Sequence, residues 1–179
     1  MRFQLTPHRN TPCDAVAAIS VDVDRPRPDT LSLRYLLEGD LGALKIPLPS
    51  PLRRSDRLWE HSCFEAFVRT PGANDYRELN FSPNRAWAAY RFESYRARLS
   101  EAAMPPPEIA SEIAGRTVAL SATVRPDLDP ELVWEIGPAT IVEDIFGKRS
   151  FWALVHPPGE PDFHHRDCFV VQLPPADRR

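Results

Sequence analysis

The chain has 179 residues, a formal net charge of −3, and a composition that is 42% hydrophobic and 26% charged. These values are ordinary for a soluble globular protein, and we expect one domain over residues 1–179. A pI near 6.0 argues against nucleic acid as the main partner. The sequence shows no signal peptide and no apolar run of about 18 residues, so we expect a cytoplasmic protein without a membrane partner.

The cysteines and histidines give no metal or disulfide pattern. Cys13, Cys63 and Cys168 are odd in number and widely separated, which favours reduced thiols. His164 and His165 are adjacent, so on an extended chain their rings point apart, and no recognised metal motif surrounds them. We therefore expect no metal site. The sequence carries no signal for an oligomeric state.

The strongest fold signal is the number of prolines, which is 20. They are scattered so that few windows could hold a long helix, which favours a β protein. Turn-forming residues separate a series of short candidate strands. These are residues 15–24, 31–37, 63–69, 77–81, 87–92, 117–124, 134–142, 150–155 and 169–173.

These strands predict an all-β fold with two packed antiparallel sheets, a β-sandwich of the jelly-roll or immunoglobulin-like kind. At most one short helix is expected, near residues 94–103, where Pro105 and the two prolines after it would end it. No internal repeat and no linker divides the chain.

The segment 58–69 contains the first candidate site residues. Trp59 lies in a turn, and the strand that follows places Glu65 on the same face as Cys63 and Phe67 by period-two alternation. An aromatic ring then stands beside a carboxylate, as in a ligand site. An edge tryptophan and a solvated glutamate explain the segment equally well.

The strands at 63–69, 77–81 and 87–92 are joined by short loops and predict a meander. If Ala88, Tyr90 and Phe92 point inward, one exposed sheet face carries Glu65, Glu78, Asn80, Trp87 and Arg91. Such a mixture of acceptors, donors and rings suits a polyhydroxylated ligand. The alternative is the polar outer face that antiparallel sheets normally have.

A proline-rich segment after the strand at 150–155 holds His156, Phe163 and His164. Loops of this kind often carry function. We expect Phe163 to be an exposed ring and Trp152 to lie partly in the core. Earlier in the chain, Arg53, Arg54 and Arg57 precede Trp59 and could meet a phosphate, although a short charge run is more often a solvated loop.

Several of these segments resemble known families. Trp59-Glu-His-Ser-Cys-Phe-Glu65-Ala-Phe-Val, Tyr76-Arg-Glu-Leu-Asn-Phe81 and Phe163-His-His-Arg-Asp-Cys-Phe169 are similar to the pattern of the family-nine carbohydrate-binding modules. Asn80-Phe-Ser-Pro-Asn-Arg-Ala-Trp-Ala-Ala-Tyr-Arg-Phe92 and His156-Pro-Pro-Gly-Glu-Pro-Asp-Phe-His164 resemble the bacterial DOMON-like proteins of the same superfamily. The likeness extends from Leu31 to Leu173.

The resemblance implies a sugar site. In the sugar-binding modules, tryptophans in the places of Trp59 and Phe163 sandwich a sugar ring, and a carboxylate matching Glu65 contacts it. An arginine of that family falls at Glu78 here, so the charge differs. DOMON relatives that bind haem use Met and His; apart from Met1, the only methionine is Met104.

Three functions follow from these observations. The favoured one is a non-catalytic module that binds a carbohydrate, a sugar phosphate or a similar polar molecule between Trp59 and Phe163, without a cofactor. The alternatives are a haem-binding redox module and a glycoside-active enzyme that uses Glu65 and Glu78 with His156 or His164. A role in protein binding alone also remains open. The expected site residues are Trp59, Glu65, Glu78, Asn80, Arg91, Trp152, His156, Phe163 and His164.

Overall fold

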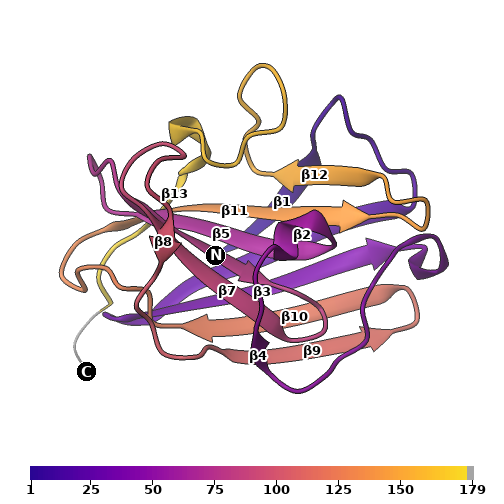
Figure 1. Cartoon of the computed structure of the whole chain (residues 1–179), viewed down its shortest axis with the longest axis horizontal. Coiled ribbons are helices and arrows are strands. Elements are labelled where there is room, and N and C mark those ends of the chain that lie inside the picture. The colour runs from indigo at the N-terminus through magenta and orange to yellow at the C-terminus, as the bar shows by residue number, and fades with distance from the viewer. Residues whose placement is uncertain (177–179) are drawn as a thin grey trace.

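The computed structural model describes residues 1–176, and most of its elements are β-strands (Figure 1). The all-β prediction is therefore confirmed. The strands are β1 (Arg2–Pro7), β2 (Val16–Arg27), β3 (Thr30–Gly39), β4 (Arg53–Arg54), β5 (Cys63–Arg69), β6 (Tyr76–Phe81), β7 (Ala86–Phe92), β8 (Ser100–Glu101), β9 (Glu108–Ala114), β10 (Thr117–Val124), β11 (Trp134–Glu143), β12 (Arg149–Ala153) and β13 (Val171–Leu173). Three short 3-10 helices are η1 (Leu41–Ala43), η2 (Leu58–Glu60) and η3 (Arg166–Cys168).

The strands form one continuous, curled sheet in the order β4-β7-β6-β5-β11-β12-β1-β2-β3-β10-β9. β1 joins its two halves, because Thr6 pairs with Ala153 of β12 and Leu5 pairs with Ile19 of β2. The pairing therefore does not show the expected jelly roll of two separate antiparallel sheets. One pair also departs from the expected direction, since β4 runs parallel to β7.

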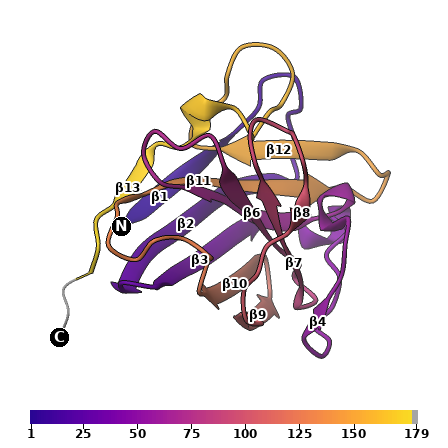
Figure 2. The ribbon, with the colours of Figure 1, turned by 60° about the vertical axis from the view of Figure 1, so that its left-hand side comes forward.

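The two halves of the sheet face each other across a shared hydrophobic core (Figure 2). Alternate residues of β3 point into it, and Tyr35 among them is fully buried. Its ring lies 5.1 Å from the ring of Phe64 on β5, and its hydroxyl donates a hydrogen bond to the Glu65 carbonyl oxygen. This core fixes the direction of β5, so that Phe64, Ala66 and Val68 point inward and Glu65 points to the opposite face.

The structure contains no helix at residues 94–103, so that prediction was wrong. Arg96 and Arg98 have φ angles of 52° and 53°, in the left-handed region that a right-handed helix excludes. Ser94 and Ala97 instead form a bridge, and β8 follows. The sequence also failed to indicate β1, β4, β8 and β9.

All three cysteines are free thiols, and Cys63 and Cys168 are buried. Among residues 1–176, no helix is long and apolar enough to cross a membrane. In both ribbon views, the segment between β12 and β13 arches above the part of the sheet that contains β11 and β12 (Figures 1 and 2). This segment carries Phe163 and His164 and forms one wall of the candidate site.

Candidate functional site

A cavity of about 460 Å³, here called the aromatic cavity, lies on the face of β5, β6 and β7 that points away from the main core. Six aromatic side chains and five ionisable ones dominate its lining. The aromatic residues are Trp59, Phe67, Tyr90, Phe92, Phe151 and Phe163, and the ionisable residues are Glu65, Glu78, Arg96, Arg149 and His164. Its volume is within the range of small-molecule pockets, as is its combination of rings with a few polar groups.

Strand register brings the two carboxyl groups together. Phe67 on β5 pairs with Glu78 on β6, and Glu78 pairs in turn with Tyr90 on β7. Residues paired directly across antiparallel strands point to the same face, and Glu65 shares the face of Phe67. Glu65 and Glu78 therefore form the polar floor of a cavity whose sides are aromatic.

Both carboxyl groups are buried, with Glu65 only 2% exposed and Glu78 only 5% exposed. Burial raises the pKa of Glu78 to about 7 and raises the pKa of Glu65 well above its usual value. The neighbouring Glu78 raises the pKa of Glu65 further, because two negative charges cannot lie close together in a poorly solvated site. The pair therefore holds at least one proton at neutral pH.

The hydrogen bonding of these carboxyl groups is incomplete. The amide of Asn80 donates to Oε1 of Glu78 over 2.8 Å. Oε1 of Glu65 and Oδ1 of Asn80 are buried and have no partner among residues 1–176. An unsatisfied buried polar atom costs about 1–3 kcal/mol, and such atoms are typical of sites that await a ligand or an ordered water.

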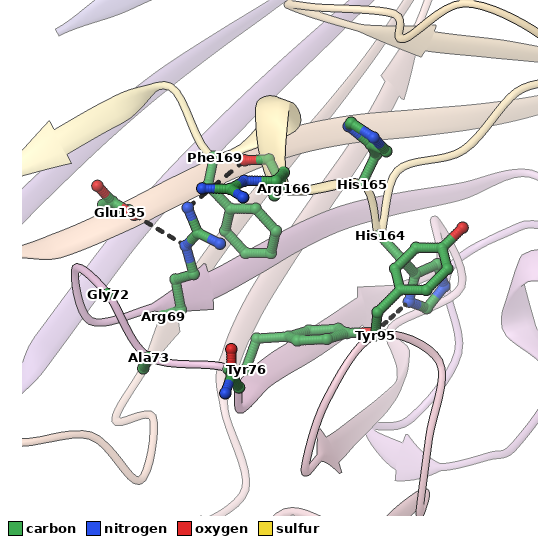
Figure 3. Close-up of a pocket in the computed structure, with 11 residues that line it drawn as sticks. Arg69, Gly72, Ala73, Tyr76, Tyr95, Glu135, His164, His165, Arg166 and Phe169 are labelled. Atoms are coloured by element: carbon green, nitrogen blue, oxygen red, sulfur yellow. Dashed lines mark hydrogen bonds and ion pairs between the residues drawn. The ribbon is translucent and has the colours of Figure 1, made fainter.

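His164 separates the aromatic cavity from a neighbouring one. Its Nδ1 lies 2.8 Å from the Tyr76 hydroxyl (Figure 3). Its Nε2 lies 3.7 Å from Oε2 of Glu78. Burial lowers the pKa of His164 to about 4, and the positive charge of Arg96 contributes to the shift. His164 is therefore a neutral ring at physiological pH, able to donate one hydrogen bond and accept another.

The aromatic walls are held by contacts with one another. Trp59 is half-buried and meets Tyr90 edge to face, with 5.6 Å between ring centroids. On the other side, Phe163 packs against Phe67 at 6.2 Å and against Phe151 at 5.9 Å. Aromatic pairs at such distances fix ring orientation. Trp59 and Phe163 thus both line the aromatic cavity.

Two expected residues lie on the other face of the sheet, because the predicted facing of β7 was wrong. Trp87 pairs with Phe81 and packs in the main core. Arg91 pairs with Arg77 and lies 3.5 Å from Asp75 at the surface. Neither lines the aromatic cavity.

Two further expected residues lie elsewhere. Trp152 is buried in the main core, where its indole N–H donates to the Ser150 hydroxyl. His156 lies against β1, with Nε2 at 2.8 Å from the Thr6 carbonyl oxygen and its ring packed on His8. Trp152 points to the core side of β12 by alternation. His156 follows the end of β12 and lies beside β1, so neither residue lines the aromatic cavity.

The expected exposure of the site also needs correction. Phe163 is 7% exposed and Asn80 is fully buried, so neither lies on an open sheet face. The segment from Pro161 to His164 covers that face and turns it into a cavity. Asn80 donates a hydrogen bond to Glu78 and is not among the lining residues.

The cluster of Arg53, Arg54 and Arg57 does not reach the aromatic cavity. Arg53 and Arg57 line a different depression, and Arg54 pairs with Glu101 at 3.3 Å. The cations at the aromatic cavity are Arg96, which pairs with Asp162 at 2.8 Å, and the exposed Arg149. Within residues 1–176, Arg149 makes no ion pair with an acidic side chain.

Several lining residues were missed by the sequence reading, namely Phe67, Tyr90, Phe92, Arg96, Arg149 and Phe151. Tyr90 and Phe92 lie on the same parity of β7, so the opposite choice of facing would have found them. Arg96 and Arg149 come from a turn and from a strand edge. No sequence periodicity indicates which cavity such residues approach.

The placement of Met104 and His164 does not support a haem held by Met and His. Among residues 1–176, no group of three or more His, Cys, Asp or Glu residues is placed to hold a metal ion. Met104 packs against the main core, and Nδ1 of His164 is occupied by Tyr76. Met104 therefore does not reach the aromatic cavity that His164 lines.

Similar folds occur among solved structures. A candidate carbohydrate-binding protein from Bacteroides uniformis matches with a TM-score of 0.65 at 13% identity, over 95% of this chain and 84% of that one. A family-nine carbohydrate-binding module from Caldicellulosiruptor kristjanssonii matches at 8% identity with a TM-score of 0.47. Its complex with glucose covers 87% of this chain and 76% of the module, and its complex with cellotriose covers 84% and 75%. No family model and no curated protein matches the sequence. The chain thus shares its fold with the Bacteroides protein.

Proposed function

We propose that this chain is a non-catalytic binding module for a carbohydrate or a similar polar small molecule, held in the aromatic cavity between Trp59 and Phe163. The observation that carries the proposal is the buried, unpartnered Oε1 of Glu65 beneath a ring-lined cavity. A sugar offers polarised C–H groups to aromatic faces and hydroxyl groups to fixed acceptors, so it suits both parts of this lining. The shared fold with a candidate carbohydrate-binding protein supports the same conclusion.

The proposal also covers the fold superfamily, the kind of ligand and the expected affinity. We also propose that the fold is a two-layer sandwich of the DOMON-like superfamily. In this chain β1 pairs with both halves of the sheet. A soluble sugar or sugar phosphate inside the cell is the proposed ligand, and Arg149 at the cavity would meet the phosphate. With about −0.3 kcal/mol for each heavy atom, a disaccharide would bind with roughly micromolar affinity at best.

The direct experiment is a glycan and sugar-phosphate screen by thermal shift, followed by titration calorimetry on wild type and Trp59→Ala. Removing the ring should weaken binding by about tenfold or more, because stacking area is lost. Phe146→Ala is the matched control, since Phe146 is 89% exposed at the turn between β11 and β12. Binding that is equal in wild type and Trp59→Ala would refute the proposed site.

Glycoside hydrolysis is the second candidate, because both Glu65 and Glu78 line the cavity with raised pKa values. A carboxylic acid that keeps its proton near pH 7 is suited to protonate a leaving group, while a second carboxylate acts as nucleophile or base. Chromogenic glycosides test this directly. Turnover that disappears in Glu78→Gln would establish an enzyme, whereas binding without turnover supports the module.

A further inference from the structure

A second cavity, of about 630 Å³, adjoins the aromatic cavity across His164 and is not used by the proposed function (Figure 3). It lies beside the β5–β6 turn and η3. The side chains that matter here are Arg69, Tyr76, Tyr95, His164, Arg166 and Phe169. His164 lines both cavities, so a ligand longer than one unit could pass over it from one cavity to the other.

Tyr95 gives the second cavity an exposed ring in a fixed position. The ring is 57% exposed, yet its hydroxyl donates to Asp162 over 2.6 Å. Asp162 also accepts from Arg96, which lines the aromatic cavity, and from the backbone N–H of His164. One half-buried carboxylate therefore contacts elements of both cavities. An exposed but anchored aromatic ring is a platform on which a ring-shaped ligand can stack.

The two cavities differ in where their charged groups lie. The floor of the aromatic cavity consists of two carboxyl groups, and its cation Arg96 is already paired with Asp162. In the second cavity, Arg69 is only 19% exposed and is held by Glu135 at 2.8 Å and by the ring of Phe169 at 4.4 Å. These contacts use Nε and one face of the guanidinium, and no other described residue binds Nη1.

Arg166 adds a second cation to the same wall. Its carbonyl oxygen lies 3.5 Å from Nη2 of Arg69, so the two residues are adjacent (Figure 3). Its side chain is exposed, and within residues 1–176 it makes no ion pair. A fixed arginine beside an uncommitted one is suited to a carboxylate, because guanidinium groups bind carboxylates through paired, charge-assisted hydrogen bonds.

We propose that the second cavity is a subsite for an acidic sugar unit, so that the ligand is an oligosaccharide with a neutral unit in the aromatic cavity and a uronic acid unit beside Arg69 and Arg166. This inference rests on the proposed function, because it extends the same ligand across His164. It assigns the carboxylate of the ligand to Arg69 and Arg166, and its second ring to the face of Tyr95.

The experiment is an array of neutral and uronate-containing oligosaccharides, read with wild type, Arg166→Glu, Tyr95→Ala and Trp59→Ala. Arg116→Glu is the matched control, since Arg116 is also exposed, lies in the turn between β9 and β10, and makes no ion pair within residues 1–176. Arg166→Glu should weaken binding of uronate-containing glycans by about tenfold or more, and Arg116→Glu should leave it unchanged. Added salt should weaken wild-type binding of the same glycans.

The outcomes separate the two proposals. Trp59-dependent binding of neutral glycans alone, unaffected by Arg166→Glu, would overturn the acidic subsite and leave the proposed function intact. Binding of uronate-containing glycans that requires both Trp59 and Arg166 supports both. Binding that requires Arg166 and not Trp59 supports the acidic subsite and overturns the proposed role of the aromatic cavity. No glycan binding on the array overturns both.

Discussion

The hydroxyl of Tyr76 and Nδ1 of His164 share a hydrogen bond across 2.8 Å. The backbone N–H of Arg96 donates to the Tyr76 oxygen over 3.1 Å, and donation from the hydroxyl to Nδ1 then satisfies both groups. Burial raises the pKa of Tyr76 to about 12, so the hydroxyl keeps its hydrogen. With the hydroxyl as donor, neutral His164 carries its own hydrogen on Nε2, the nitrogen that faces Glu78, and this is the tautomer assignment that we test.

Substitution of Tyr76→Phe should raise the pKa of His164 from its value of about 4. The Tyr76 hydroxyl donates to the neutral imidazole, and loss of that bond removes a preference for the uncharged form. The change should also cost about 1–2 kcal/mol of unfolding free energy, because Nδ1 and the Arg96 N–H lose their partner. NMR titration of the histidine ring measures the pKa. Tyr90→Phe, which removes a hydroxyl that donates to Asp56, is the control. An unchanged His164 pKa in Tyr76→Phe would contradict the assignment.

Glu78→Gln should lose less unfolding free energy than wild type when the pH rises. The pKa of folded Glu78 is about 7, above the ordinary glutamate value of 4.5, so the native state holds a proton that the unfolded state releases. This contribution is fully present below about pH 4.5 and is lost as the pH rises to about 7. Its size is about 2–4 kcal/mol, at 1.36 kcal/mol for each pKa unit.

Urea unfolding of wild type and Glu78→Gln at pH 4.5 and pH 8 measures this difference. The variant should lose less stability than wild type between the two values, and Glu93→Gln at the exposed surface should behave as wild type. Equal losses in wild type and Glu78→Gln would show that Glu78 does not retain its proton on folding.

His164→Gln should lose less unfolding free energy than wild type when the pH falls. The pKa of folded His164 is about 4, below the ordinary 6.5, so the unfolded state takes up a proton that the native state excludes. This penalty is absent above pH 6.5 and grows as the pH falls to about 4, reaching roughly 2–4 kcal/mol. The stability of wild type relative to His164→Gln should therefore decrease between pH 7 and pH 4. A constant difference over this range, measured by urea unfolding, would rule out a buried neutral imidazole.

Gly137→Ala should weaken both the fold and ligand binding. A Cβ at this position on β11 would lie 2.8 Å from the Cys168 carbonyl oxygen, which belongs to the segment that covers the site. The segment must shift, at a cost of about 1–3 kcal/mol, and Phe163 would shift with it. Thermal unfolding and sugar titration measure the two effects. Gly42→Ala is the control, since its Cβ would meet its nearest neighbour at 3.4 Å; wild-type behaviour of Gly137→Ala would argue against close docking.

Arg25→Lys should destabilise the protein by about 2–4 kcal/mol. The buried guanidinium donates to the carbonyl oxygens of Pro28, Pro130, Leu132 and Leu173, and its carbon lies 3.6 Å from the Trp134 ring centroid. An ammonium group cannot reach so many acceptors in one plane. Chemical unfolding measures the change, with the exposed Arg27→Lys as control. If Arg25→Lys loses no more unfolding free energy than the control, water must hydrogen-bond these carbonyl groups in place of the guanidinium.

The parts of the fold that local pattern controls were predictable. β5 begins and ends at Cys63 and Arg69 as expected, because Phe64, Ala66 and Val68 recur at every second position and form its core-facing side. Glu65 and Phe67 lie on one face for the same reason. β9 was missed although it pairs along most of β10, since its alternation places glutamates at the sheet edge and resembles a loop.

The facing of β7 could not be obtained from the sequence. Ala86 to Phe92 has apolar residues at both parities, so periodicity allows either face to point inward. The structure directs Trp87 and Ala89 to the main core and Tyr90 and Phe92 to the aromatic cavity. The covering of Glu65 and Glu78 by a segment roughly a hundred residues later is a tertiary contact, and no local pattern encodes it.

The distance in sequence between the floor of the site and its cover has a consequence during synthesis. Glu65 and Glu78 are made long before Phe163 and His164, so on the nascent chain both carboxyl groups face water and ionise as ordinary acids. Each takes up its anomalous pKa only when the covering segment has docked. The proton that the finished pair retains at neutral pH is therefore acquired at the end of folding, and its uptake marks the closure of the aromatic cavity.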